Sequence, residues 1–420
     1  MAAKIKTFKK SSYISNLIDT RMTNVPLSIN KRIDSIDVLR GIVMVIMAID
    51  HIRDNFHIYA NTDDPLNLAS TSPGLFMTRW ITHFCAPVFV FLSGTSIYLQ
   101  SLRKTPNELS SFLVKRGLWL IVAEFLIVSV SITFLPWNLL ILQVIWAIGI
   151  SMVCMALLTR LPFNVILALG LLIVLGHNAL DFTEKSADFQ PGFWWEILHH
   201  GHLKFYGFDQ THGLLIVYPF LPWLGLMLMG YCLGILFKPE VEPARRKKTL
   251  LYMGGGILAF FLVLRMINIY GDPVPWAEQK SGLLTVFSFI NVFKYPPSLL
   301  YMCLFIGPAL ILLALIEPIK NRFTDIMRIF GRTAFFYYII HWFVVHGLAG
   351  ILFFINGHTF AEAIASARNL PFLFVLSGEG VSLPFVYLIW IIVIMALYPL
   401  CKKYDQYKTV HKEKWWLSYL

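Results

Sequence analysis

Seven ionisable side chains lie within one apolar stretch near the beginning of the chain, residues 36–58. They are Asp37, Arg40, Asp50, His51, Arg53, Asp54 and His57. A charge at the centre of a membrane helix costs roughly 2.5 kcal/mol or more on insertion scales, and such charges often mark functional sites. This stretch is therefore the first place to look for chemistry.

The spacing of these residues indicates that several share one helical face. With a helical rise of about 1.5 Å per residue, His51 lies roughly 16 Å beyond Arg40. A separation of eleven positions makes about three turns, so the two side chains point to the same side. One-turn spacings, typical of neighbours on a helix surface, also connect a group near the far end of the stretch: Asp50, His51, Arg53, Asp54 and His57.

This pattern suits acyl transfer across a membrane. A histidine can accept a proton from an attacking hydroxyl or amine, and a neighbouring carboxylate can orient it. An arginine can bind the phosphates or the carbonyl of an acyl donor. We predict a catalytic group of His51, Asp50, Asp54 and His57, and donor binding by Arg40 and Arg53. Two other interpretations fit the residues: a neutralised charge cluster that fixes helix packing, and a path for protons or ions.

Candidates for substrate binding are spread over three other segments. Arg79 and His83 are one helical turn apart, and His341 falls in the middle of an apolar stretch. Trp194 and Trp195 lie in a segment rich in aromatic residues and histidine, where they could stack on a sugar ring. The structural alternatives are an arginine at the membrane interface, a hydrogen-bonded core histidine and an interfacial aromatic belt. Neither the histidines nor the five cysteines have metal-ligand spacing, so no metal and no disulfide are expected.

Composition indicates the elements that hold these residues. Of the 420 residues, 57% are apolar and 14% are charged, whereas about a quarter are charged in soluble domains. Apolar runs of roughly 20 residues can cross the hydrocarbon core, and they must be helical because lipid offers the backbone no hydrogen bonds. The predicted fold is an all-α polytopic membrane bundle with about ten transmembrane helices, near 36–58, 77–100, 112–134, 138–158, 163–180, 214–237, 249–270, 297–316, 332–354 and 382–401.

The distribution of Lys and Arg predicts the orientation of this bundle. With the N-terminus inside, 26 of the 35 basic residues fall on inside segments and eight fall outside. We therefore expect both termini in the cytoplasm, and a cytoplasmic (inner) membrane location. The expected organisation is a basic segment 1–32, a transmembrane domain 33–402 and a tail 403–420. The first apolar run is too long for a cleavable signal peptide. Because the positive-inside pattern explains the net charge of +11, nucleic acid is not an expected partner.

Five stretches in order along the chain carry a family resemblance. They read 33-IDSIDVLRGIVMVIMAIDH-51, 84-FCAPVFVFLSGTSIYL-99, 294-KYPPSLLYMCLFIGPALILLALIE-317, 330-FGRTAFFYYIIHWFVVHGL-348 and 398-YPLCKKYDQYKTVHKEKWWLSYL-420. The first resembles the opening motif of the transmembrane acyltransferase superfamily, in which a histidine follows an arginine as His51 follows Arg40. All five resemble the bacterial DUF1624 group, related to heparan-α-glucosaminide N-acetyltransferase.

The resemblance implies a function. Enzymes of this type transfer an acyl group, commonly acetyl from cytoplasmic acetyl-CoA, to a sugar amine or hydroxyl on the far side of the membrane. It implies His51 as base or acyl relay and Arg40 as the donor-side cation. In the lysosomal relative an asparagine stands where Asp50 does and the histidine lies closer to His57, so both histidines are candidates. The implied partners are the lipid bilayer and a glycan or amino-sugar acceptor, and we also hypothesise a homodimer. The alternative from another class is a proton-coupled or small-molecule transporter that uses the charged helix.

Overall fold

A computed structural model of the chain describes residues 32–60, 62–135, 138–201, 203–209, 212–367 and 372–418. Almost all of the predicted basic segment 1–32, and Arg368, lie outside the described residues. Residues 33–420 form one compact unit that is mainly helical. Its longer helices are α1 (Asp34–Phe56), α2 (Pro73–Thr82), α3 (Cys85–Ser101), α4 (Pro106–Ala123), α6 (Val144–Leu158), α7 (Phe163–Gly176), α10 (Phe220–Leu233), α11 (Pro243–Ile267), α12 (Gly282–Ile290), α13 (Leu299–Ile316), α14 (Arg322–Arg332), α15 (Ala334–Ile355) and α17 (Leu383–Val410).

Short elements connect these helices. They are η2 (Glu124–Val128), α5 (Ser129–Thr133), η3 (His177–Ala179), α8 (Asp181–Glu184), α9 (Phe193–Trp195), η4 (Glu196–His200), η5 (Gly234–Phe237), α16 (Phe360–Ser366) and η6 (Trp415–Ser418). Three strands, β1 (Leu139–Leu142), β2 (Lys204–Gly207) and β3 (Gly213–Ile216), complete the described elements.

Seven helical segments of the described chain are long and apolar enough to cross a membrane. They are Pro73–Ser101, Phe163–Glu184, Phe220–Phe237, Pro243–Ile267, Leu299–Ile316, Ala334–Ile355 and Leu383–Val410. The protein is therefore a multi-pass α-helical membrane protein. The other three predicted spans coincide with the charged helix α1, with α4–η2–α5, which contains a π-helical turn, and with α6 of only 15 residues. The count of ten spans and the inside position of both termini stay predictions.

Several predicted boundaries were wrong. The ranges 138–158 and 214–237 each begin with a strand, and their helices start only at Val144 and Phe220. The helical range 77–100 is broken at His83, where α2 ends and α3 follows. Helix α17 continues to Val410, past the predicted end at residue 401. Periodicity cannot separate a short buried strand from the apolar helix that follows it.

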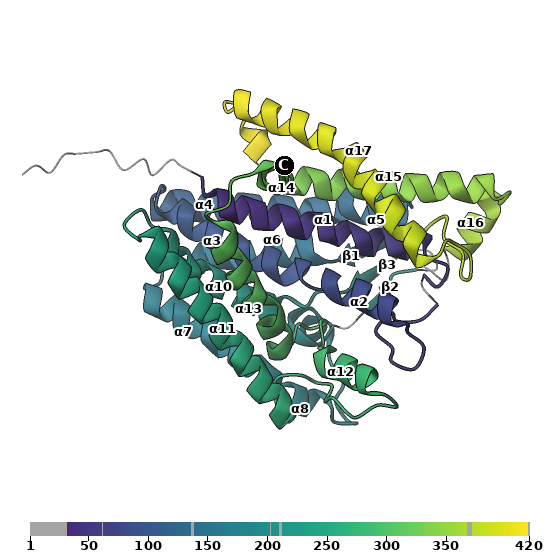
Figure 1. Cartoon of the computed structure of the whole chain (residues 1–420), viewed down its shortest axis with the longest axis horizontal. Coiled ribbons are helices and arrows are strands. Elements are labelled where there is room, and N and C mark those ends of the chain that lie inside the picture. The colour runs from purple at the N-terminus through teal and green to yellow at the C-terminus, as the bar shows by residue number, and fades with distance from the viewer. Residues whose placement is uncertain are drawn as a thin grey trace, which may run out of the picture. The chain divides into compact units, whose positions relative to one another are not determined.

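Helix α1 lies at the centre of the helical unit. It packs against α2, α3, α13, α14, α15 and α17 (Figure 1). The contact with α14 depends on glycine, since a Cβ added at Gly41 or Gly331 would collide with the backbone of the opposite helix. Gly230 of α10 approaches the Phe91 backbone of α3 in the same way, and Gly234, the first residue of η5, lies against the Tyr98 side chain; such small-xxx-small spacing allows helices to pack closely. The charged helix is thus surrounded by protein on most sides.

The three strands form a small sheet in the order β1–β3–β2. Strands β1 and β3 are parallel, with Leu142 opposite Ile216, and β2 is antiparallel to β3. Because β1 and β3 run in the same direction, the residues that follow them emerge at the same edge. The amides of Val217 and Tyr218 donate to the Leu142 carbonyl at 3.1 and 3.0 Å. The sheet therefore places Gln143 and Tyr218 side by side.

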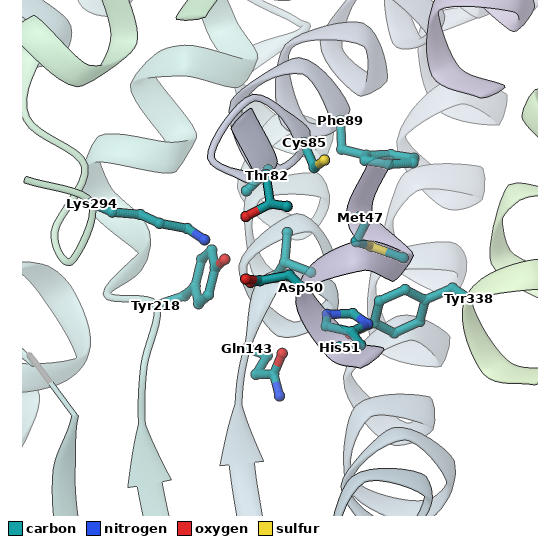
Figure 2. Close-up of a pocket in the computed structure, with 12 residues that line it drawn as sticks. Met47, Asp50, His51, Thr82, Cys85, Phe89, Gln143, Tyr218, Lys294 and Tyr338 are labelled. Atoms are coloured by element: carbon teal, nitrogen blue, oxygen red, sulfur yellow. The ribbon is translucent and has the colours of Figure 1, made fainter. Parts of the chain in front are cut away.

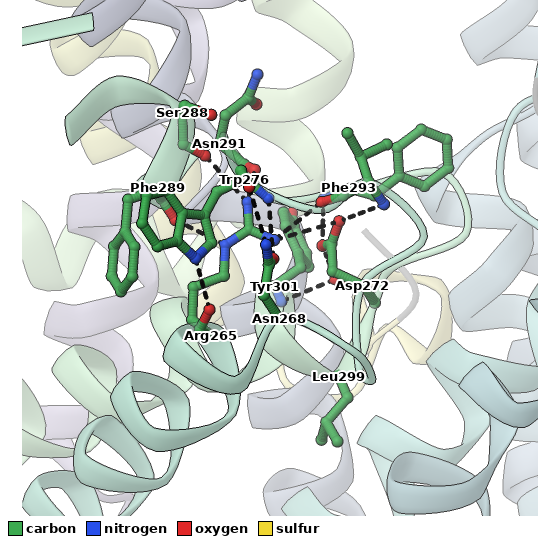
Figure 3. Close-up of polar contacts among 12 residues, drawn as sticks. Arg265, Asn268, Asp272, Trp276, Ser288, Phe289, Asn291, Phe293, Leu299 and Tyr301 are labelled. Carbon is green, nitrogen blue, oxygen red and sulfur yellow. Dashed lines mark hydrogen bonds and ion pairs between the residues drawn. The ribbon is translucent and has the colours of Figure 1, made fainter. Parts of the chain in front are cut away.

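A second polar network organises the segment between α11 and α13 (Figure 3). Arg265, 1% exposed at the end of α11, donates to four carbonyl oxygens at 2.7–3.0 Å, those of Val274, Ser288, Phe289 and Asn291. Three of these lie at the C-terminal end of α12, where a helix leaves carbonyls without intrahelical partners. Asp272 accepts from the Phe293 amide at 2.8 Å and from the Ser298 hydroxyl at 2.7 Å. The loop 291–298 is anchored at both ends.

Candidate active site

A small cavity lies beside the second half of α1 (Figure 2). Its polar lining combines three residues of helices, His51, Asp50 and Thr82, with three residues of connecting segments, Gln143, Tyr218 and Lys294. The remaining lining residues are Met47, Cys85, Ala86, Phe89, Val144 and Tyr338. A few polar and charged side chains thus line this cavity together with apolar ones, which is the usual composition of a small-molecule site.

His51 is held by a chain of hydrogen bonds that defines which ring nitrogen carries the proton. A carbonyl oxygen can only accept, so Nδ1–H of His341 donates to the Tyr337 carbonyl at 3.1 Å. In the neutral ring, Nε2 of His341 then accepts from Nδ1–H of His51, and these nitrogens are 2.6 Å apart. The lone pair of His51 is therefore on Nε2, an atom that forms no hydrogen bond with any described residue. Nε2 is free to accept a proton from a ligand in the cavity.

Aromatic packing fixes the plane of the His51 ring. Trp342 is stacked on it with 3.9 Å between ring centroids and 21° between planes. The Tyr338 ring is nearly perpendicular to it, with 6.5 Å between the ring centroids. Two residues of α15, His341 and Trp342, thus orient the one histidine of α1 that lines the cavity. The structure brings His51 and His341 together, although 290 residues separate them along the chain.

Asp50 sits between two arginines. Its Oδ2 is paired with Arg79, and its Oδ1 is 2.9 Å from Nη2 of Arg53. Nη2 of Arg53 is also 2.5 Å from Oδ1 of Asp54. Asp50, Arg53 and Asp54, all predicted site residues of α1, therefore form one ion-pair network with Arg79. Within it Arg53, predicted to bind the donor, is engaged by two carboxylates.

Other predicted residues lie away from the lining of the cavity. His57 ends α1, and its Nδ1 accepts from the Tyr59 amide at 3.3 Å. His83 is buried and packs edge-on against Tyr301 and Phe305, with 5.8 and 6.1 Å between the ring centroids. Arg40, toward the other end of α1, donates to Asp37 at 3.0 Å and to Ser96 of α3 at 3.1 Å.

The two tryptophans of the predicted sugar platform have different environments. Trp194 is 78% exposed. The indole N–H of Trp195 instead donates to Oε1 of Glu184 at 2.8 Å, and the same oxygen accepts from Nδ1 of His199 at 2.7 Å. Neither tryptophan lines the cavity at His51. A role for them in binding a glycan stays a prediction.

Four polar lining residues, Thr82, Gln143, Tyr218 and Lys294, were missed by reasoning from the sequence alone. Gln143 and Tyr218 stand in apolar segments without any motif, while Lys294 is the first residue of the family-like stretch 294–317 but was not singled out within it. Gln143 is available because the carboxylate of Glu124, which accepts from the Trp146 amide at 2.7 Å, caps the start of α6 in its place. The nearest available signal was the position of Lys294, directly before the sequence YPPS.

The size of the cavity limits what it can hold. Its volume of about 50 Å³ accommodates a few water molecules or the reacting end of an acyl donor, but not a whole coenzyme or sugar ring. The cavity is therefore large enough for the reacting groups of the two substrates but not for the whole of either substrate. Among the described residues, no group of three or more His, Cys, Asp or Glu is arranged to hold a metal ion.

The comparison with known families agrees with this chemistry. The family model for heparan-alpha-glucosaminide N-acetyltransferase, catalytic, matches residues 32–265. This chain belongs to that family of membrane acetyltransferases, and the match does not favour the transporter interpretation. The matched range contains α1 and the stretch 84–99, while the three later stretches, with Lys294 and His341, lie beyond it. No curated protein matches the chain.

Proposed function

We propose that the protein transfers an acetyl group from acetyl-CoA to a sugar amine or hydroxyl, with His51 as the general base. The observation that carries the proposal is the hydrogen-bond chain from His51 through His341 to the Tyr337 carbonyl. This chain leaves the lone pair on Nε2 of His51, a residue that lines a cavity of the size of the reacting groups. A correctly placed base contributes typically 10²–10⁴-fold to rate.

The proposed roles of the neighbouring residues follow from their contacts. His341 is a positioning residue, because it holds the tautomer of His51 without touching a ligand. Asp50 offsets the charges of the two arginines beside the cavity. Arg40 marks the direction from which the donor would approach, about three helical turns from His51.

The predicted orientation implies two routes into the cavity. With the N-terminus inside, His51 lies in the outer half of α1, and the segments that carry Gln143, Tyr218 and Lys294 lie outside. A sugar acceptor would enter between these external segments, and the donor would enter from the cytoplasmic half near Arg40. Transfer in a site largely surrounded by protein limits competing hydrolysis by water.

The test is acetyl transfer by detergent-purified protein supplied with radiolabelled acetyl-CoA and glucosamine. Free coenzyme A and acetylated sugar are measured for the wild type, His51→Ala and His57→Ala. We expect His51→Ala to lose at least about a hundredfold in rate, while His57→Ala, on the same helix but away from the cavity, stays within about threefold. Melting curves of both variants control for folding. Loss of activity in His57→Ala alone would contradict the assignment, and stoichiometric acetyl-CoA binding by none of the proteins would favour a transporter.

A further inference from the structure

Lys294 is a buried cation that lines the same cavity. It lies on the loop between α12 and α13 and is only 8% exposed. Figure 2 shows its side chain pointing inward, with the ammonium group next to the Tyr218 ring and on the Asp50 side of the cavity. The aromatic ring of its neighbour Tyr295 lies 5.0 Å from the ammonium nitrogen.

The charges around the cavity leave Lys294 without a counter-ion. Asp50 is shared by Arg79 and Arg53, and Asp54 is paired with Arg53. Lys294 forms no ion pair with any carboxylate of the described residues. Burying an ammonium group without a counter-ion is unfavourable even beside the Tyr295 side chain, so this arrangement lowers stability instead of raising it.

The protein nevertheless holds Lys294 firmly in place. On one side the Phe293 amide donates to Asp272 at 2.8 Å (Figure 3). On the other side the Ser298 hydroxyl donates to the same carboxylate at 2.7 Å. The positive charge is felt nearby: burial would raise the pKa of Tyr295, but Lys294 and Arg79 outweigh burial and lower that pKa below its ordinary value. A buried and rigidly held cation without a carboxylate counter-ion is suited to an anion that exists only during reaction.

We propose that Lys294 is a catalytic residue that stabilises the oxyanion formed on the acyl carbonyl during transfer, an inference that rests on the proposed function. The acceptor amine or hydroxyl bonds to the carbonyl carbon of the thioester and gives its proton to Nε2 of His51. The carbonyl π electron pair moves onto oxygen, and the resulting negative charge is matched by the Lys294 ammonium. When the C=O bond forms again, the C–S bond breaks and the thiolate receives the proton from His51.

The variants Lys294→Met and Lys294→Arg test this role. The control is Lys280→Met, because Lys280 is exposed and also lies between α11 and α13. In the assay with acetyl-CoA and glucosamine, Lys294→Met should lose about 10²–10³-fold in kcat, the cost of removing one oxyanion donor. KM for both substrates should change less than about threefold, and Lys294→Arg should keep much of the activity. Because the buried charge is gone, Lys294→Met should melt no lower than the wild type.

Three outcomes would overturn the proposal. A loss that appears only in KM for glucosamine would make Lys294 an acceptor-binding residue. A large fall in melting temperature together with lost activity would make it structural. A kcat within about threefold of the wild type would remove it from the chemistry.

A binding measurement separates this proposal from the proposed function. If the wild type does not acetylate glucosamine, binding of a trifluoromethyl ketone analogue of acetyl-CoA is followed by tryptophan fluorescence. The ketone hydrates to a tetrahedral, acidic group that resembles the oxyanion. The dissociation constant should be at least about tenfold weaker for Lys294→Met than for the wild type and for Lys280→Met. Equal binding by all three proteins, or binding by none, would refute the role of Lys294.

Discussion

Replacing Arg265 by Met should loosen the loop that carries Lys294. Arg265 donates to four carbonyl oxygens at 2.7–3.0 Å and lies 3.8 Å from Asp272. Methionine fills a similar volume but donates no hydrogen bond, so four carbonyls lose this donor, and the buried carboxylate of Asp272 keeps its hydrogen bonds but loses the cation beside it. Removing one member of a buried charge pair costs roughly 3–5 kcal/mol, and buried acceptors left alone add to this.

These energies convert into measurable shifts. If the size scaling of soluble proteins is applied to a chain of this length, about 1 kcal/mol corresponds to roughly 1 °C, so the melting temperature should fall by roughly 3–5 °C. Local opening that is easier by about 3 kcal/mol speeds amide exchange by roughly a hundredfold. Hydrogen–deuterium exchange of peptides from residues 271–298, which include the Phe293 amide, is the direct assay. Arg245→Met, at the exposed start of the same helix, is the matched control.

The loss should also depend on pH. Burial raises the pKa of Asp272, and Arg265 opposes this increase. Without Arg265 the pKa rises further, and a carboxyl group with a raised folded-state pKa loses stability as pH rises above its unfolded value. The melting temperature of Arg265→Met should therefore be further below that of the wild type at neutral pH than at acidic pH. Unchanged exchange in 271–298, or a pH-independent difference, would refute the view that Arg265 holds this loop.

Two further predictions concern the charged helix and the orientation of the bundle. Asp50→Asn and Arg79→Gln should each lower the melting temperature, and the double variant should recover part of the loss, with a coupling of about 0.5–3 kcal/mol; additive losses would show that the ion pair contributes nothing. In a cysteine-free background, Lys280→Cys should react with an impermeant maleimide from outside intact cells and Arg245→Cys only after lysis, whereas the reverse pattern would invert the predicted topology.

The sequence alone was sufficient for the class of protein and for the part of the candidate site that lies on α1. Helix formation in lipid is determined locally, because an apolar run must satisfy its own backbone, so the ten predicted spans all overlap helices. His51 and Asp50 were found for a similarly local reason, since ionisable residues in an apolar run are conspicuous. The family resemblance of the first motif was equally readable, and the family match covers it.

Only the tertiary structure decided which residues meet His51. His341, Tyr218 and Lys294 come from separate segments, and contacts between distant segments depend on how the helices pack and not on local pattern. The strands that deliver Gln143 and Tyr218 are four residues long and merge with apolar helices, so no periodicity reveals them. The choice between His51 and His57, open in the sequence, became a structural distinction because one of them faces the cavity and the other ends the helix.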